Sequence, residues 1–115
     1  MGLATDCLLI VNNHRDRFQD EKNGKKTLAV KFGKNFSIIS YYILGIVATF
    51  LSITSIIMIK GPQWSSFIPI IYLIGHLINA DFLRKNEGKA LNKALGKTAM
   101  NIFAFSIFTF LGIVL

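Results

Sequence analysis

An uncharged run from Phe36 to Ile59 constrains the fold of this chain more than any other feature. A helix rises about 1.5 Å per residue, so the run extends roughly 36 Å, enough to cross a hydrocarbon core of about 30 Å. In lipid, a backbone segment must satisfy its own hydrogen bonds, and a helix does so locally. The run therefore predicts a membrane-spanning helix over residues 36–59.

Two further uncharged segments, 65–80 and 99–115, predict additional spans. The first contains Pro69, His76 and Asn79, whose polar groups need protein neighbours inside a membrane. The chain of 115 residues is 52% hydrophobic and 17% charged, which is too apolar for an ordinary soluble domain. We therefore expect an all-α integral membrane helical bundle with three to four transmembrane helices.

The N-terminal residues 1–11 are apolar apart from Asp6, but they make only about half a span. No basic residue precedes the apolar stretch Leu8–Val11 and no small-residue cleavage site follows it, so these residues do not fit a signal peptide. We expect a half helix over residues 1–11 that leads into a polar motif and loop over residues 12–35.

Basic residues are concentrated in two blocks. Residues 12–35 hold seven Lys and Arg against three acidic residues, and residues 81–97 hold five against two. Two predicted spans separate the blocks, so both lie on one side, which the positive-inside rule makes the cytoplasmic side of a bacterial-type inner membrane. Because long uncharged stretches separate the blocks, the positive net charge does not indicate a nucleic-acid partner.

The segment NNHRDRFQD, residues 12–20, carries the candidate chemistry. On a continuous helix, Asn12, Asp16 and Asp20 lie one turn apart, and Asn13 adjoins them. Two carboxylates on one face repel each other unless a cation lies between them. Mg²⁺ is typically held by one or two carboxylates together with substrate phosphates. The spacing fits either a Mg²⁺ site or a solvated face whose aspartates pair with neighbouring cations.

The polar residues nearby have simpler interpretations. His76 and Asn79 lie one turn apart and are expected to hydrogen-bond between helices. Cys7, the single cysteine, is expected to be a small buried apolar residue and cannot form an internal disulfide. Positive charge for an anionic ligand is available from Arg15, Arg17, Lys25 and Lys26.

Residues 12–33, NNHRDRFQDEKNGKKTLAVKFG, closely resemble the second aspartate-rich motif of the UbiA superfamily of intramembrane prenyltransferases. They are most similar to the 1,4-dihydroxy-2-naphthoate polyprenyltransferase branch, with its pattern N-N-x-R-D-x-x-x-D followed by G-[KR]-x-T-L-[AV]-V-x-x-G. The second part of the pattern falls without a gap on Gly24, Lys25, Thr27, Leu28, Val30 and Gly33. The spans that follow resemble the last third of such enzymes.

The resemblance implies a membrane enzyme of menaquinone biosynthesis. It would transfer a polyprenyl group from polyprenyl diphosphate to 1,4-dihydroxy-2-naphthoate, at the ring carbon that loses its carboxylate as CO₂. Asp16 and Asp20 would hold Mg²⁺ against the diphosphate. The residues implied in diphosphate or substrate binding are Asn12, Asn13, Arg15, Lys25 and Lys26.

The chain also departs from the family pattern. Family members are longer and carry a first aspartate-rich motif, N-x-x-x-D-x-x-x-D, on an earlier helix that is not found here. We therefore expect a C-terminal part of such an enzyme, inactive alone and requiring an N-terminal half. Two alternatives stay open: another UbiA-type aromatic prenyltransferase, acting for example on hydroxybenzoate or homogentisate, or a non-catalytic small membrane protein derived from one.

Overall fold

The protein is built from four α-helices and two short 3₁₀ helices, and it contains no strand. A computed structural model describes all residues, 1–115. The elements in chain order are α1 (Gly2–Lys22), α2 (Leu28–Lys60), η1 (Trp64–Phe67), α3 (Ile70–Lys85), η2 (Gly88–Ala90) and α4 (Leu91–Val114). The prediction of an all-α bundle is confirmed.

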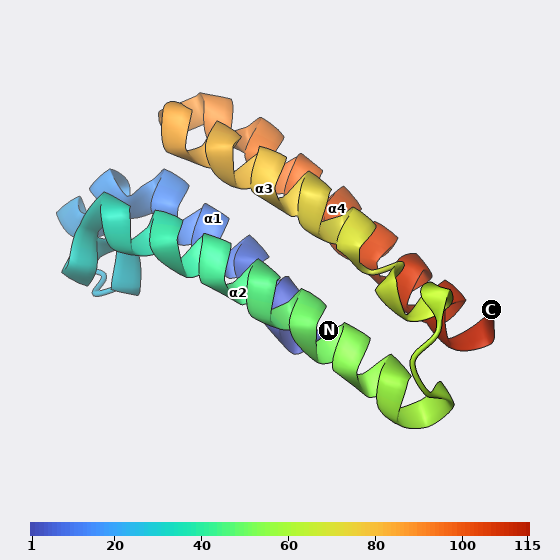
Figure 1. Ribbon diagram of the computed structural model, residues 1–115. Coiled ribbons are helices and arrows are strands. Elements are labelled where there is room, and N and C mark those ends of the chain that lie inside the picture. Colours follow the sequence, from blue (N-terminus) through green and yellow to red (C-terminus); the bar gives the residue numbers. More distant parts are fainter.

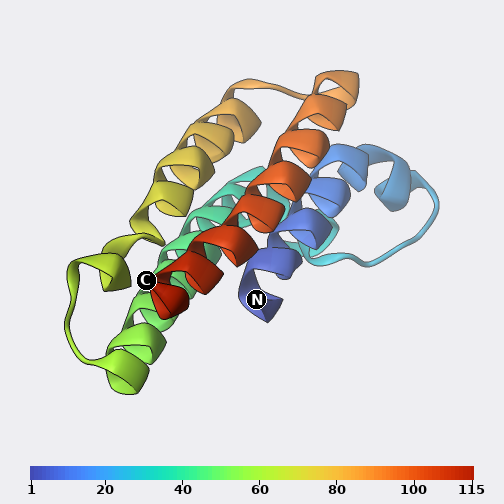
Figure 2. The same cartoon turned by 90° about the vertical axis from the view of Figure 1, so that its right-hand side faces the viewer.

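The helices run side by side in alternating directions and make an elongated bundle (Figure 1). In Figure 2, α4 lies over α2, with α3 on one side and α1 on the other. The helix α1 begins beside the middle of α2. Its Ala4 shares a buried cluster with Ala48, Tyr72 and Phe105. The polar half of α1 therefore extends toward the end of the bundle where α2 begins.

Three segments are long and apolar enough to cross a membrane: Leu28–Lys60, Trp64–Lys85 and Gly88–Val114. They contain the three predicted spans, and each is longer than its uncharged run. The reason is that a charged residue does not end a helix once it lies outside the hydrocarbon, where water satisfies its side chain. Pro69 does not interrupt α3, since it lies at the residue before the first helical position, where a missing N–H costs nothing.

The prediction of a loop over much of residues 12–35 is wrong, because α1 continues through the polar motif to Lys22 and α2 begins at Leu28. Local backbone chemistry explains the short connection. Gly24 adopts a φ of 73°, and Lys25 N–H donates to the Asp20 carbonyl, which closes the end of α1. The Thr27 hydroxyl then accepts from the Val30 N–H and caps the start of α2.

A break at Gly33 divides α2 into a short first segment and a long second one. Gly33 has φ 85° and ψ −176°, a backbone conformation that a side chain makes unfavourable. The chain changes direction there, and the long segment then runs to Lys60. The positions of Gly24, Thr27 and Gly33 in the motif thus match a helix stop, a helix start and a change of direction.

Buried polar groups join α2, α3 and α4. His76 Nε2 lies 2.7 Å from the Tyr41 carbonyl, which can only accept, so this nitrogen carries the proton. The His76 ring stacks on the Tyr41 ring with centroids 4.4 Å apart, and Tyr41 Oη lies 2.8 Å from Thr98 Oγ1. The predicted interhelical role of His76 is confirmed. Cys7 is buried, as expected, and Asn79 is buried on α3.

Replacing Gly45 with alanine should destabilise the bundle, because a Cβ at this position would overlap the His76 ring. We expect Gly45→Ala to lower the free energy of unfolding in detergent by about 1–3 kcal/mol. Gly96, which has open space around it in α4, provides the control, and Gly96→Ala should be neutral or stabilising by up to about 1 kcal/mol. Equal effects of the two substitutions would contradict the close approach of α2 and α3.

Candidate functional site

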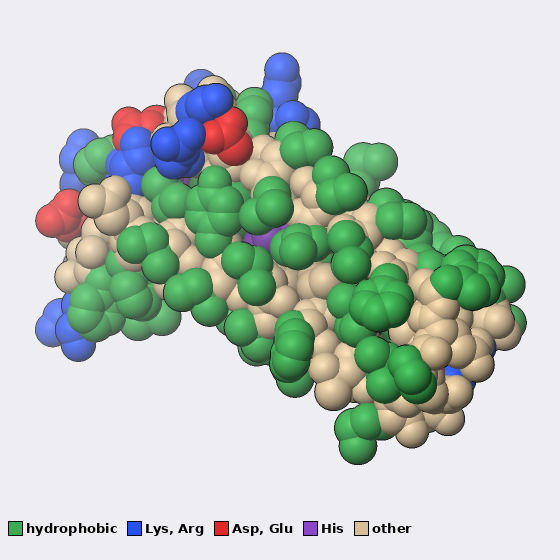
Figure 3. All heavy atoms as spheres, in the orientation of Figure 1, with side chains coloured by type: hydrophobic (Ala, Val, Ile, Leu, Met, Phe, Trp, Pro, Cys, Tyr) green, Lys and Arg blue, Asp and Glu red, His purple; other side chains and the backbone are tan.

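The aspartate motif lies at the charged end of the bundle. The space-filling view in Figure 3 shows acidic and basic side chains gathered over this end, while hydrophobic side chains cover most of the remaining surface. The start of α2 and the connection between α3 and α4 lie at the same end as the polar half of α1. Segments far apart in the sequence therefore surround the motif.

Arg15 is the centre of a hydrogen-bond network around Asp16. Its Nε and one terminal nitrogen donate to the two Asp16 carboxylate oxygens over 2.7 and 2.8 Å. The same terminal nitrogen donates to Asn12 Oδ1 over 2.7 Å, and the other donates to Asn92 Oδ1 at the start of α4 over 3.0 Å. Hydrogen bonding to the guanidinium holds the pKa of Asp16 below its ordinary value. Asp16 is thus kept ionised and fixed in orientation.

Asp20 lies one turn further along α1 and is almost completely buried. Its carboxylate lies 3.7 Å from Lys25 Nζ, across the turn that closes the helix. Both aspartates occupy the C-terminal half of α1, where the helix dipole disfavours negative charge. A cation at this position therefore has two carboxylates and the helix end to stabilise it.

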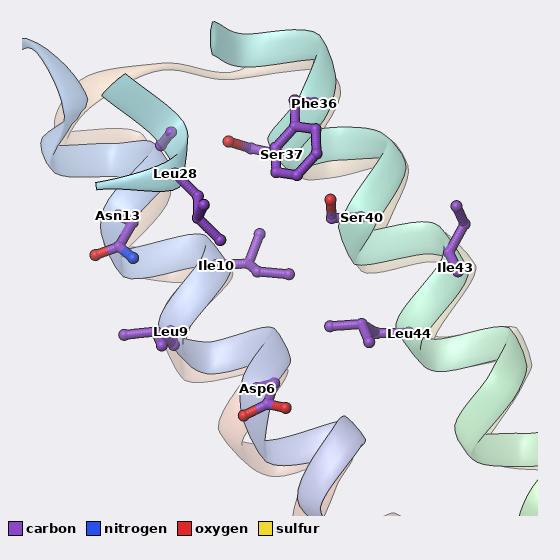
Figure 4. Close-up of a pocket in the computed structure, with 11 residues that line it drawn as sticks. Asp6, Leu9, Ile10, Asn13, Leu28, Phe36, Ser37, Ser40, Ile43 and Leu44 are labelled. Carbon is purple, nitrogen blue, oxygen red and sulfur yellow. The ribbon is translucent and has the colours of Figure 1, made fainter. Parts of the chain in front are cut away.

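The remaining predicted residues point in different directions. Asn13 lines a groove of about 470 Å³ between α1 and α2, where most of the lining residues are hydrophobic. Figure 4 shows Asn13 at the polar end of this groove, with Leu9 and Ile10 further along α1 and Leu44 across from them. Lys26 is exposed and takes part in no ion pair. The structure therefore brings Asn12, Arg15 and Asp16 together, and pairs Lys25 with Asp20.

A second network fixes the motif to the rest of the bundle. Glu87, just before η2, accepts from Arg17 over 3.1 Å and from Lys34 over 2.9 Å. His14 is fully buried, and burial lowers its pKa to about 4. Arg17 can only donate to His14 Nε2, 3.4 Å away, so the proton of the neutral ring lies on Nδ1, which has no partner.

The donor set fits a hard divalent cation that is completed by a ligand. Asp16 and Asp20 supply carboxylate oxygens, but no group of three or more His, Cys, Asp or Glu side chains comes together anywhere in the chain. Such a site cannot enclose a structural zinc ion, which takes four protein ligands. It does suit Mg²⁺, which commonly keeps several waters and binds through one or two carboxylates plus phosphate oxygens.

Two participants in these networks were not identified from sequence. Asn92 and Glu87 lie more than 65 residues beyond the motif, and neither belongs to a recognisable pattern. The one available signal was the predicted placement of both charged blocks on the same side of the membrane, which brings residues 81–97 near the motif without indicating a pair.

Asn92 and Arg15 should be energetically coupled. A double-mutant cycle of Arg15→Ala and Asn92→Ala, measured by reversible unfolding in detergent, should give a coupling of about 0.5–1 kcal/mol, as for other exposed charge-assisted contacts. Lys93→Ala is the matched control, because Lys93 is exposed next to Asn92 and makes no hydrogen bond with Arg15. Additive effects of Arg15→Ala and Asn92→Ala would show that α4 does not hold the guanidinium.

Comparison with known families agrees with the geometry of the site. The sequence profile of the UbiA prenyltransferase family matches residues 1–111, which include the motif and all four helices. Comparison with curated proteins and with solved structures gave no match. The match covers nearly the whole chain, and three of its helices are suited to span a membrane. The chain is therefore an integral membrane protein that belongs to the UbiA prenyltransferase family.

Proposed function

We propose that this chain takes part in the transfer of a polyprenyl group from polyprenyl diphosphate to 1,4-dihydroxy-2-naphthoate, a step of menaquinone biosynthesis. Membership of the family supports prenyl transfer to an aromatic acceptor in general. The narrower choice of acceptor rests on the N-N-x-R-D form of the motif at residues 12–16. The chain would act together with a further membrane segment that carries the first aspartate-rich motif.

The observation that carries the proposal is the pair of carboxylates one helical turn apart on α1. Asp16 is held in place by Arg15, and Asp20 is buried beside Lys25. In this proposal the two aspartates hold Mg²⁺, and Lys25 and Lys26 contact the diphosphate. Asn12 and Asn13 complete the polar surroundings of the two substrates.

Charge neutralisation is the chemical task of this site. The prenyl carbon–oxygen bond breaks, the electron pair leaves with the diphosphate, and the acceptor ring forms the new carbon–carbon bond and loses CO₂. When bound, Mg²⁺ supplies positive charge to the departing diphosphate oxygens. Arg15, Lys25 and Lys26 add positive charge at the same end of α1, which favours departure of the anion.

The groove between α1 and α2 suits the hydrocarbon tail of the prenyl donor. It begins beside Asn13 and continues between apolar side chains of both helices. A tail in this groove would lie parallel to the helices, with its diphosphate near Asp16 and Asp20. In this proposal the end of the bundle that carries the basic blocks lies on the cytoplasmic side of the inner membrane, as the positive-inside rule favours, where the acceptor and the released diphosphate are dissolved in water.

We expect prenyl transfer to be lost when either aspartate is neutralised. The assay uses membranes that contain this chain, with and without a co-expressed N-terminal half of a related enzyme, plus dihydroxynaphthoate, a polyprenyl diphosphate and Mg²⁺. Asp16→Asn and Asp20→Asn should each lower the rate about 100-fold or more, because each removes a charge that stabilises the leaving group. Chelation of Mg²⁺ with EDTA should have the same effect.

Glu21→Gln is the matched control, since Glu21 is an exposed acidic residue on the same helix, next to Asp20. Its rate should equal that of the unchanged chain. Equal use of hydroxybenzoate or homogentisate would reject the assigned acceptor while keeping the reaction class. If no acceptor yields product when an intact relative works in the same membranes, the chain is a non-catalytic membrane protein and the proposed function is wrong.

A further inference from the structure

Asp6 is an acidic side chain whose position is unusual for this fold. It is exposed on α1, and it takes part in no ion pair within the chain. One other acidic residue, Glu21, is likewise unpaired, but it lies at the charged end of α1, close to the Lys22–Lys26 segment. Asp6 therefore differs from all other acidic side chains in its surroundings.

The neighbours of Asp6 place it at the depth of the membrane interior. It lines one groove with Ile43 and Leu44 and a second with Ala48 and Leu51, all from α2. These residues form the middle of the uncharged run 36–59. An ionisable side chain at this depth is costly to expose to lipid, and in membrane proteins it normally faces a protein interior or pairs with another group.

The bundle itself offers no such group. Arg15 lies about 13 Å and Lys97 about 9 Å along the helix axes from the level of Asp6, and the Lys97 ammonium lies over the Phe82 ring rather than beside Asp6. His76 lies within the spans, but its ring nitrogens already contact the Tyr41 carbonyl and the Tyr72 hydroxyl. The Asp6 carboxylate therefore needs a partner from outside the chain.

The surface around Asp6 is shaped to receive a helix. A groove of about 470 Å³ lies on one side of it, and its walls combine apolar side chains with the small hydroxyl side chains of Ser52 and Ser55. Figure 4 shows Asp6 on α1 at the end of the other groove that is farthest from Asn13. On α1 itself, Gly2 and Thr5 are exposed beside Asp6 and allow another backbone to come close.

A second copy of this chain cannot supply the cation that pairs with Asp6. Two copies inserted in the same orientation place identical residues at the same depth, so a dimer would bring carboxylates and no Lys or Arg side chain to the level of Asp6. The charge that complements Asp6 must come from a different membrane segment.

We propose that the α1–α2 face around Asp6 docks a transmembrane helix of another protein segment that carries a Lys or Arg side chain near the middle of the membrane. The ion pair formed with Asp6 selects this partner, and the groove beside Ala48 and Leu51 accepts its apolar side chains. The proposal does not depend on prenyl transfer, because it concerns the assembly of the bundle.

The test is association with synthetic helices in phosphatidylcholine vesicles, followed by energy transfer between fluorophores on the chain and on the peptide. The probes are leucine-rich peptides of roughly 20 residues with Lys, Leu or Glu at the centre. The Lys peptide should bind about 10-fold more tightly than the Leu peptide. Asp6→Leu should remove this difference, and Glu21→Gln should preserve it.

A charge exchange gives a positive control that does not rely on loss of binding. Asp6→Lys should bind the Glu peptide in preference to the Lys peptide, reversing the selectivity of the unchanged chain. Equal binding of the Lys and Leu peptides, or a preference for Lys that persists in Asp6→Leu, would overturn the proposal. Self-association of the chain that is lost in Asp6→Leu would also overturn it, since the face would then belong to a second copy.

Discussion

The contact between His76 and the Tyr41 carbonyl sets the relative heights of the helices on which the rest of the structure depends. Gly45 leaves room for the His76 ring, and the Tyr72 hydroxyl lies beside the other ring nitrogen. The Tyr41 hydroxyl in turn lies within hydrogen-bond distance of Thr98 on α4. Apolar packing between membrane helices permits sliding, because lipid tails are as apolar as the side chains. Directional hydrogen bonds at this depth fix one register.

That register determines which residues meet at the charged end, about two to three helical turns away. With α2, α3 and α4 fixed in height, the start of α4 comes level with Arg15, and the residues before η2 come level with Arg17 and Lys34. A shift by one helical turn would separate these pairs by about 5 Å. The geometry around Asp16 therefore depends on contacts in the membrane interior as much as on the motif itself.

The parts of the structure that follow local rules could be predicted from sequence. Uncharged runs located the spans, and the spacing of Asn12, Asp16 and Asp20 gave the face they share once the helix was assumed continuous. Helix ends at Lys22 and Leu28 were missed, because charge marks the edge of the hydrocarbon rather than the end of a helix. The bond between Arg15 and Asn92 depends on register between distant helices, which no local pattern records.

The break at Gly33 also affects the depth of Asp16 and Asp20 in the membrane. Before it, Leu28 and Phe32 are 59% and 52% exposed, with Lys31 positioned over the Phe32 ring. A short segment that combines exposed apolar side chains with lysines belongs at the boundary between headgroups and acyl chains. Because only a tight turn joins α1 to this segment, a segment held at that boundary also keeps Asp16 and Asp20 level with the headgroups. At this level the two aspartates border both water and lipid.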